Sequence, residues 1–351
     1  MAQGRFRPTG RSSAPVPSAG MAQGVSPLDT AHNGPIHACQ LDHFGKRLAT
    51  ASADSTVRVW DVETRWFVAE LKGHSGPVWA VAWAHPAHGP LLATGGEDCC
   101  AVVWREAEGE WCQIHRQEVQ GQVISAAFGP REYGLQLAVA GSDGNITVLS
   151  YDDSHHQPSE RWRTETFRAH EGGAFAVCWA PATSPAVLNS EDVAVQSTVL
   201  QPRKLVTGGA DNQVRIWRHD ELTDTWADEH HFPSGEHRDW VRDVAWRPNA
   251  GIPSNTIASC AEDGTIVIWK QAMVGQPWGR QQKFELSTSA WQVSWNITGA
   301  MLAVSTSSNQ VLLYKETPAG KWENVPEFND HGVGTSQIGA SPGDDSIPDI
   351  S

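Results

Sequence analysis

Histidine, aspartate and a serine or threonine recur together along the chain, and these three side-chain types could together act as a hydrolase triad. Each set also contains a tryptophan, and the order and spacing of the hydroxyl, aspartate and tryptophan are constant. The complete sets are His32, Thr50, Asp54 and Trp60; His74, Thr94, Asp98 and Trp104; His170, Thr207, Asp211 and Trp217; and His237, Ser259, Asp263 and Trp269. Four copies at one structural spacing are not four active sites, so we predict no catalytic residues.

The same residues fit a structural role better. A histidine, an aspartate, a hydroxyl and an indole N–H can form a relay in which each buried donor meets an acceptor. Two further segments have lost most of the relay together, and they carry Val119, Val139 and Leu149 beside Asp143, and Leu286, Val304 and Tyr314 beside Ser308. A half-satisfied buried network costs more than an apolar one, so joint loss is expected of a structural element.

The relays belong to a repeated unit. Six segments share a short apolar stretch, a turn with small residues, and an alternation that ends at residues 60, 104, 149, 217, 269 and 314. A repeat of about 40–45 residues with four short strands is typical of a propeller blade. We therefore predict an all-β fold, a six-bladed WD-repeat β-propeller over residues 32–327, with an insertion at about 181–203 in blade four. The fourth strand often carries tryptophan, at Trp66, Trp111, Trp162, Trp226, Trp278 and Trp322.

Composition excludes several classes of function. The 351 residues include 26 Lys and Arg against 40 Asp and Glu, a net charge of −14 that argues against direct nucleic-acid binding. No apolar run approaches the roughly 18–20 residues of a membrane span, and the N-terminus lacks the apolar core of a signal peptide. The pair Cys99–Cys100 would need two further ligands to bind a metal, and no phosphate-binding loop is present. We predict no cofactor, and disordered tails at 1–31 and 328–351.

The ends of the repeat array predict an open ring. Blade one has its own four strands from about Ile36, blade six has its own through Trp322, and nothing strand-like precedes His32. No strand from one end of the chain is therefore left to join the other end. We expect the facing surfaces of blades one and six to form an apolar partner site, whose residues the pattern does not assign.

Several stretches carry a specific resemblance, among them LDHFGKRLATASADSTVRVWDVE, GHSGPVWAVAWAHPAHG and KLVTGGADNQVRIW. They resemble the family of small WD-repeat subunits of the outer coat of COPII vesicles, which also serve in the Y-shaped scaffold complex of the nuclear pore. The resemblance runs from about His32 to Phe328. It includes the presence of an insertion in blade four, whereas Leu149, the sequence of that insertion and both tails depart from it.

The resemblance implies a non-enzymatic scaffold for endoplasmic reticulum (ER)-to-Golgi transport and for the nuclear pore, where mRNA transport takes place. It implies an open propeller that is completed by a blade donated in trans from an elongated α-solenoid partner. That partner would be the large outer-coat subunit of COPII or a scaffold nucleoporin. The chain would be cytoplasmic, at ER exit sites, on COPII vesicles and at the nuclear envelope, and would reach membranes only through coat partners.

A different class of function stays open at this point. A peptide-reading WD-repeat adaptor, such as a ubiquitin-ligase substrate receptor, would need an internally closed ring and a basic or aromatic pocket at the central channel. The sequence WDVE places Glu63 where the WDxR pattern of ligase receptors has arginine.

Overall fold

The computed structural model describes residues 28–154, 161–182, 201–248 and 254–325. Thr30–Glu327 form one compact unit, so Thr30 and Ala31 belong to the propeller rather than to the predicted tail. Residues 1–27 and 328–351 of the predicted tails, and the predicted insertion apart from 181–182 and 201–203, lie outside the described residues. Among the described residues there is no helix long and apolar enough to span a membrane.

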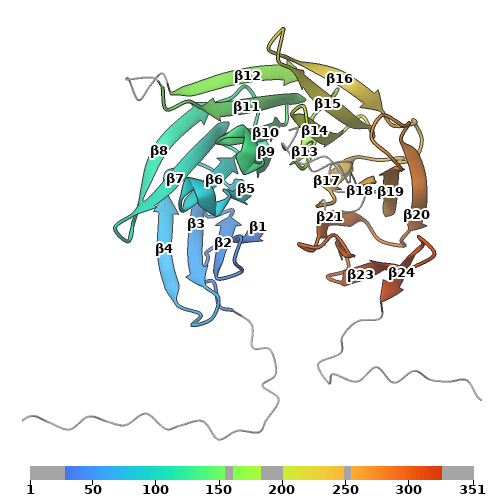
Figure 1. Ribbon diagram of the computed structural model, residues 1–351. Helices are drawn as coiled ribbons and strands as arrows, with labels where there is room; N and C mark the ends of the chain where they lie inside the picture. Colours follow the sequence, from blue (N-terminus) through green and yellow to red (C-terminus); the bar gives the residue numbers. More distant parts are fainter. Residues whose placement is uncertain (1–27, 155–160, 183–200, 249–253, 326–351) are drawn as a thin grey trace, which may run out of the picture. The chain divides into compact units, whose positions relative to one another are not determined.

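The described strands form six four-stranded antiparallel sheets, one for each predicted blade (Figure 1). Blade one contains β1 (Ile36–Leu41), β2 (Arg47–Ser52), β3 (Thr56–Asp61) and β4 (Phe67–Lys72). Blade two contains β5 (Val78–Trp83), β6 (Leu91–Gly96), β7 (Cys100–Ala107) and β8 (Glu110–Glu118). Blade three contains β9 (Val123–Phe128), β10 (Gln136–Gly141), β11 (Asn145–Tyr151) and β12 (Trp162–Arg168).

The second half repeats the arrangement. Blade four contains β13 (Ala174–Trp179), β14 (Lys204–Gly209), β15 (Val214–Asp220) and β16 (Thr225–His231). Blade five contains β17 (Val241–Trp246), β18 (Asn255–Ala261), β19 (Thr265–Gln271) and β20 (Gly279–Glu285). Blade six contains β21 (Ala290–Trp295), β22 (Met301–Thr306), β23 (Val311–Glu316) and β24 (Trp322–Val325). The described helices are short 3-10 turns, η1 (Pro86–His88) and η2 (Arg131–Tyr133).

Glycine at the end of a second strand makes room for the relay histidine. A Cβ on Gly96 would lie 2.9 Å from Nδ1 of His74, and a Cβ on Gly209 would lie 2.3 Å from Cγ of His170. A side chain there would displace the imidazole from its hydrogen-bonding position, so the small residue is needed for close approach rather than for an unusual backbone angle.

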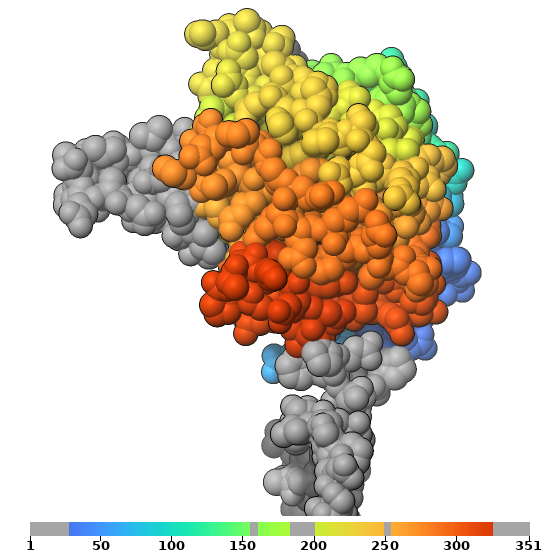
Figure 2. Space-filling model, turned by 90° about the vertical axis from the view of Figure 1, so that its right-hand side faces the viewer, coloured from blue at the N-terminus to red at the C-terminus, as the bar shows by residue number. Residues whose placement is uncertain are grey.

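Successive blades are held together by apolar cores that each draw on two neighbouring sheets. Such cores join blades one and two, two and three, three and four, four and five, and five and six. Figure 2 shows blades four, five and six as yellow, orange and red bands that pack directly against one another. No core among the described residues joins blade six to blade one, which lie at the two ends of the series with no sheet between them (Figure 1). The prediction of a six-bladed open propeller is therefore confirmed.

Candidate functional site

The blade-two relay is complete in the structure. His74 Nδ1 lies 2.9 Å from Asp98 Oδ1, His74 Nε2 lies 2.8 Å from Thr94 Oγ1, and the indole of Trp104 donates to Thr94 at 2.9 Å. Burial opposes ionisation of Asp98, but hydrogen bonds from His74 and Ser75 lower its pKa overall. Burial also lowers the pKa of His74 and favours the neutral ring. The ring therefore donates from Nδ1 to the carboxylate and accepts the threonine proton at Nε2.

The relays of blades four and five differ at the aspartate. His170 Nδ1 lies 2.8 Å from Asp211, and Thr207 bonds both His170 and Trp217. In blade five, His237 Nδ1 lies 2.6 Å from Thr265 Oγ1 and does not bond Asp263 directly. The hydroxyl of Thr265 in turn donates to Asp263 at 2.6 Å. The other end of the blade-five relay follows the expected pattern, with Ser259 between His237 and Trp269. Blade one also has a hydroxyl two residues after its aspartate, at Thr56, but there His32 lies 2.9 Å from Asp54 itself, so the sequence carried no signal for this extra link.

Blade one departs from the expected relay at its tryptophan. His32 contacts Asp54 and Thr50 at 2.9 Å each, but the buried indole N–H of Trp60 has no hydrogen-bond partner. In blades two, four and five the matching ring is part of a core shared with the preceding blade. No blade precedes blade one, so the ring of Trp60 instead packs edge-on against Phe67, 5.5 Å between centroids.

None of these sets is arranged to meet a substrate. The side chains of His32, His74 and His170 are at most 2% exposed, and burial lowers the pKa of His237 to about 4. Where the relay is lost, Val139, Leu149 and Val304 are buried among apolar neighbours. The recurring polar residues therefore organise the interior of individual blades, and a candidate site must be sought elsewhere.

Blade six has an apolar face that no other blade covers. The position that opens the third-strand alternation is 0–2% exposed in the first five blades, at Val57, Ala101, Ile146, Val214 and Ile266. The same position in blade six is Val311, and it is 53% exposed. In the other blades this side chain packs against the blade that follows, so Val311 marks the surface where a following blade is missing. We call this surface the trailing face of blade six.

Blade one has the complementary uncovered surface, which we call its leading face. In blades two and four to six, an aromatic residue ends the inner strand and contacts the fourth-strand tryptophan, with both packed toward the preceding blade. In blade one these positions are Leu41, 51% exposed, and Trp66, 75% exposed. The leading face of blade one and the trailing face of blade six together form the open joint.

Sequence reasoning placed a partner site at this joint without assigning residues to it. The usable signal was Leu41, because the inner strand of blade one ends in an aliphatic residue where the others end in Trp or Phe. Trp66 was visible as a repeat tryptophan, but its exposure follows only from the absence of a preceding sheet. Val311 looks like an ordinary core residue in the sequence.

Comparisons with known proteins agree with this geometry. A family model described as "WD domain, G-beta repeat" matches residues 25–61, 65–105, 162–218 and 230–270, and these four ranges contain the four relays. The Drosophila melanogaster "Protein SEC13 homolog" is 37% identical over 302 residues, covering 85% of this chain and 82% of the relative. "Protein transport protein sec13" of Emericella nidulans is 36% identical, covering 86% and 97%. "Protein transport protein SEC13" of Cryptococcus neoformans is 36% identical, covering 90% and 98%.

The chain belongs to the SEC13 family of WD-repeat proteins. This confirms the resemblance found in the sequence, which covered all six blades. Membership agrees with the buried relays, since a WD-repeat scaffold uses them for stability rather than for chemistry.

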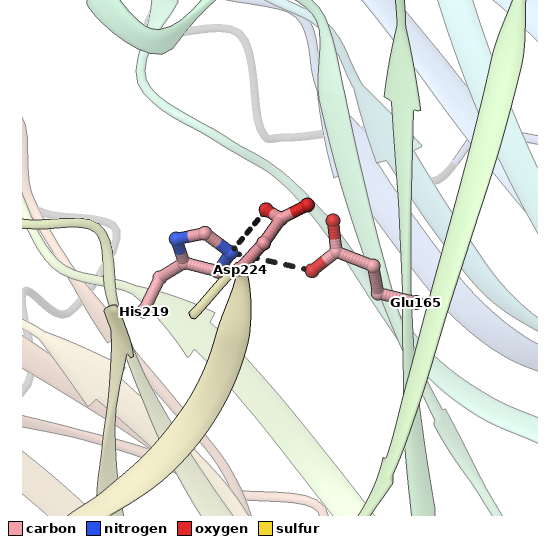
Figure 3. Close-up of side chains that lie close together, drawn as sticks. All are labelled: Glu165, His219 and Asp224. Atoms are coloured by element: carbon pink, nitrogen blue, oxygen red, sulfur yellow. Dashed lines mark ion pairs between the residues drawn. The ribbon is translucent and has the colours of Figure 1, made fainter. Parts of the chain in front are cut away.

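One cluster in this SEC13-family chain has the composition of a metal site. The ring of His219 on β15 points toward Glu165 of β12 and Asp224 of the β15–β16 turn (Figure 3). Its Nε2 lies 3.2 Å from Asp224 and 3.4 Å from Glu165. However, Arg203 lies 2.7 Å from Nδ1, and a guanidinium can only donate. A neutral ring then carries its hydrogen on Nε2, the side that faces the two carboxylates, and the cluster is an ion network between blades three and four.

The joint between blades five and six contains a buried carboxyl group. Asp243 on β17 accepts the backbone N–H of Val293 on β21 at 3.0 Å and that of Val244 at 2.9 Å. Burial raises the pKa of Asp243 to about 7, against the weaker opposing effect of the two backbone hydrogen bonds. The carboxyl group of Asp243 thus links the last two blades.

Replacing Asp243 with alanine should therefore change how stability depends on pH. The unfolded chain loses the Asp243 proton near pH 4 and the folded chain near pH 7, so this group stabilises the fold below pH 4 and loses that effect as the pH rises to 7. We expect Asp243→Ala to cost most at pH 5 and least at pH 8, measured by urea unfolding. The exposed Asp239→Ala is the control, and equal pH profiles for both variants would refute the assignment.

Proposed function

We propose that this chain is a non-catalytic scaffold subunit of the COPII outer coat in ER-to-Golgi protein transport, and of the scaffold of the nuclear pore. The relatives named as protein transport proteins support the first role, and the family resemblance supports both. The observation that carries the proposal is the open joint, because an apolar surface with Trp66 at 75% and Val311 at 53% exposure is unusual unless a partner covers it.

The partner in this proposal is an elongated α-solenoid protein that donates a blade in trans. It is the large outer-coat subunit on vesicles and at ER exit sites, and a scaffold nucleoporin at the nuclear envelope. The chain stays on the cytoplasmic side of membranes, which it reaches through these partners. Its net charge of −14 supports the absence of direct nucleic-acid contacts.

A peptide-reading adaptor is less well supported. Rings of Phe175, Trp240 and Trp291 from three blades do gather around one point, as a reader's pocket would. The guanidinium of Arg242 occupies that point and pairs with Glu262, so the rings already have their ligand. The unclosed ring also departs from the internally closed propeller that such an adaptor needs.

Affinity purification of the tagged full chain tests the proposal. We expect coat subunits and nucleoporins in the recovered material. Val311→Glu should reduce their recovery at least tenfold, because it places a charge on the trailing face at a position that is already 53% exposed and so should not unfold the blade. Leu222→Glu, at a turn residue that is 97% exposed, is the matched control and should recover them normally. Recovery of ligase adaptors in place of coat subunits would contradict the proposal.

A further inference from the structure

The contacts between neighbouring blades have a direction. The indole that ends an inner strand donates its N–H to a backbone carbonyl of the preceding blade at three of the five joints. Trp83 donates to Gln40 at 3.0 Å, Trp179 to Ala127 at 2.9 Å, and Trp295 to Ala245 at 3.1 Å. The acceptor is always the fifth residue of the preceding inner strand. The bonds of Trp179 and Trp295 are partly buried and that of Trp83 is exposed, and each joins two neighbouring blades where an amphipathic indole finds a partner for its N–H.

A second contact comes from the same fifth position. The side chain of Gln40 accepts the backbone N–H of Trp83 at 2.7 Å, and the thiol sulfur of Cys178 accepts that of Trp246 at 3.3 Å. Trp83 therefore receives both contacts from Gln40, while Trp246 receives only the side-chain contact from Cys178 and its indole N–H has no hydrogen-bond partner.

In blade six the fifth residue of the inner strand is Ser294, which is exposed. Its carbonyl stands where Gln40, Ala127 and Ala245 present theirs, and its hydroxyl can accept as the side chains of Gln40 and Cys178 do. The opposite side of the open joint offers no equivalent donor. Blade one ends its inner strand with Leu41, so the inner-strand position of its leading face supplies apolar contact but no indole N–H.

We propose that the segment filling the open joint carries a tryptophan at the end of its inner strand and donates the indole N–H to the Ser294 carbonyl. The inserted segment therefore has one orientation in the joint. Its indole faces blade six, and its small or β-branched residues face Leu41 and Trp66 of blade one. The inference rests on the proposed function, since it describes the blade that a partner would supply.

A copy of this chain's own blade two is a suitable probe. Residues 74–118 carry an inner strand that ends in Trp83 and a fourth strand with Trp111, which together pack on a preceding blade. The probe is the full chain with this copy joined to its N-terminus through a flexible linker. The matched control is the same fusion with Trp83→Phe in the appended copy only, which keeps an aromatic ring and removes the N–H.

The readouts are the melting temperature and the hydrogen exchange of β23 amides. We expect the tryptophan copy to protect β23 and to melt about 1–2 °C above the phenylalanine copy, the shift that loss of one hydrogen bond produces in a folded unit of this size. Ser294→Ala should lower both melting temperatures alike and leave the difference between the copies unchanged, because the hydroxyl would serve the backbone N–H that both copies carry and the carbonyl remains. Equal melting temperatures for the two copies would overturn the inference. A tryptophan copy that leaves β23 unprotected would also overturn the inference. The proposed function is tested independently, by the recovery of coat subunits and nucleoporins.

Discussion

Trp104→Phe will lower the free energy of unfolding by about 1–2 kcal/mol, and Asp98→Ala by about 2–4 kcal/mol. The first change removes the indole bond to Thr94 and leaves the ring contacts largely in place. The second removes the acceptor of His74 Nδ1 and also the partner of Arg116, in a side chain that is only 5% exposed. A buried imidazole N–H without an acceptor pays the full cost of its lost hydration.

Blade one provides the matched control for this prediction. Trp60→Phe shrinks an equally buried ring at the same repeat position, but the indole N–H of Trp60 makes no hydrogen bond. We expect it to cost less than Trp104→Phe by roughly 1 kcal/mol. Val139→Thr should bring no gain, because the apolar surroundings of Val139 in blade three offer no relay partner.

Urea unfolding of the four variants separates these effects. The unfolding is followed by circular dichroism under conditions in which the protein does not aggregate. The expected order of stability loss is Asp98→Ala, then Trp104→Phe, then Trp60→Phe. If Trp104→Phe and Trp60→Phe cost the same, the indole bond does not contribute and the relay is not the source of blade stability.

Most of the fold could be predicted because the same sequence pattern recurs in each blade. The constant offset between the aspartate turn and the terminal aromatic residue identifies each blade, and the alternation of apolar residues locates its strands. The lack of a closing strand could also be predicted, since blade one already uses Ile36–Leu41 as its inner strand and blade six is complete through β24.

What could not be predicted depends on contacts between blades. The indole of Trp60 lacks a hydrogen-bond partner, and no preceding blade packs against it. This follows from the opening in the propeller and not from the sequence of blade one. His237 reaches Asp263 through Thr265 because a hydroxyl happens to lie between them. Ser294 and Val311 are ordinary residues in their strands, and only their position beside the missing blade gives them a role.

Binding of a blade-donating partner will raise the melting temperature of the chain in proportion to the logarithm of the partner concentration. The partner binds the folded form alone, so it stabilises by mass action, and each tenfold excess over the dissociation constant adds about 1.4 kcal/mol. An inserted blade would bury about 1,500–2,500 Å², in the range of permanent interfaces. The free chain should self-associate through the same uncovered apolar faces, and the complex should not.

Deletion of residues 1–28 checks the alternative that the N-terminal segment closes the ring. We expect the shortened chain to keep its melting temperature and its affinity for the partner. A lower melting temperature would mean that this segment contributes a closing strand, and the open-ring account would then be wrong.

Hydrogen exchange of the inner strands, measured with and without the partner, tests the central claim most directly. In the free chain, the amides of β1 and β21 that face the open joint should exchange much faster than those of β9, which lies between two neighbouring blades. On binding, β1 and β21 should both become protected while β9 stays unchanged. Protection of neither strand, or of only one of them, would contradict the insertion of a blade between blade six and blade one.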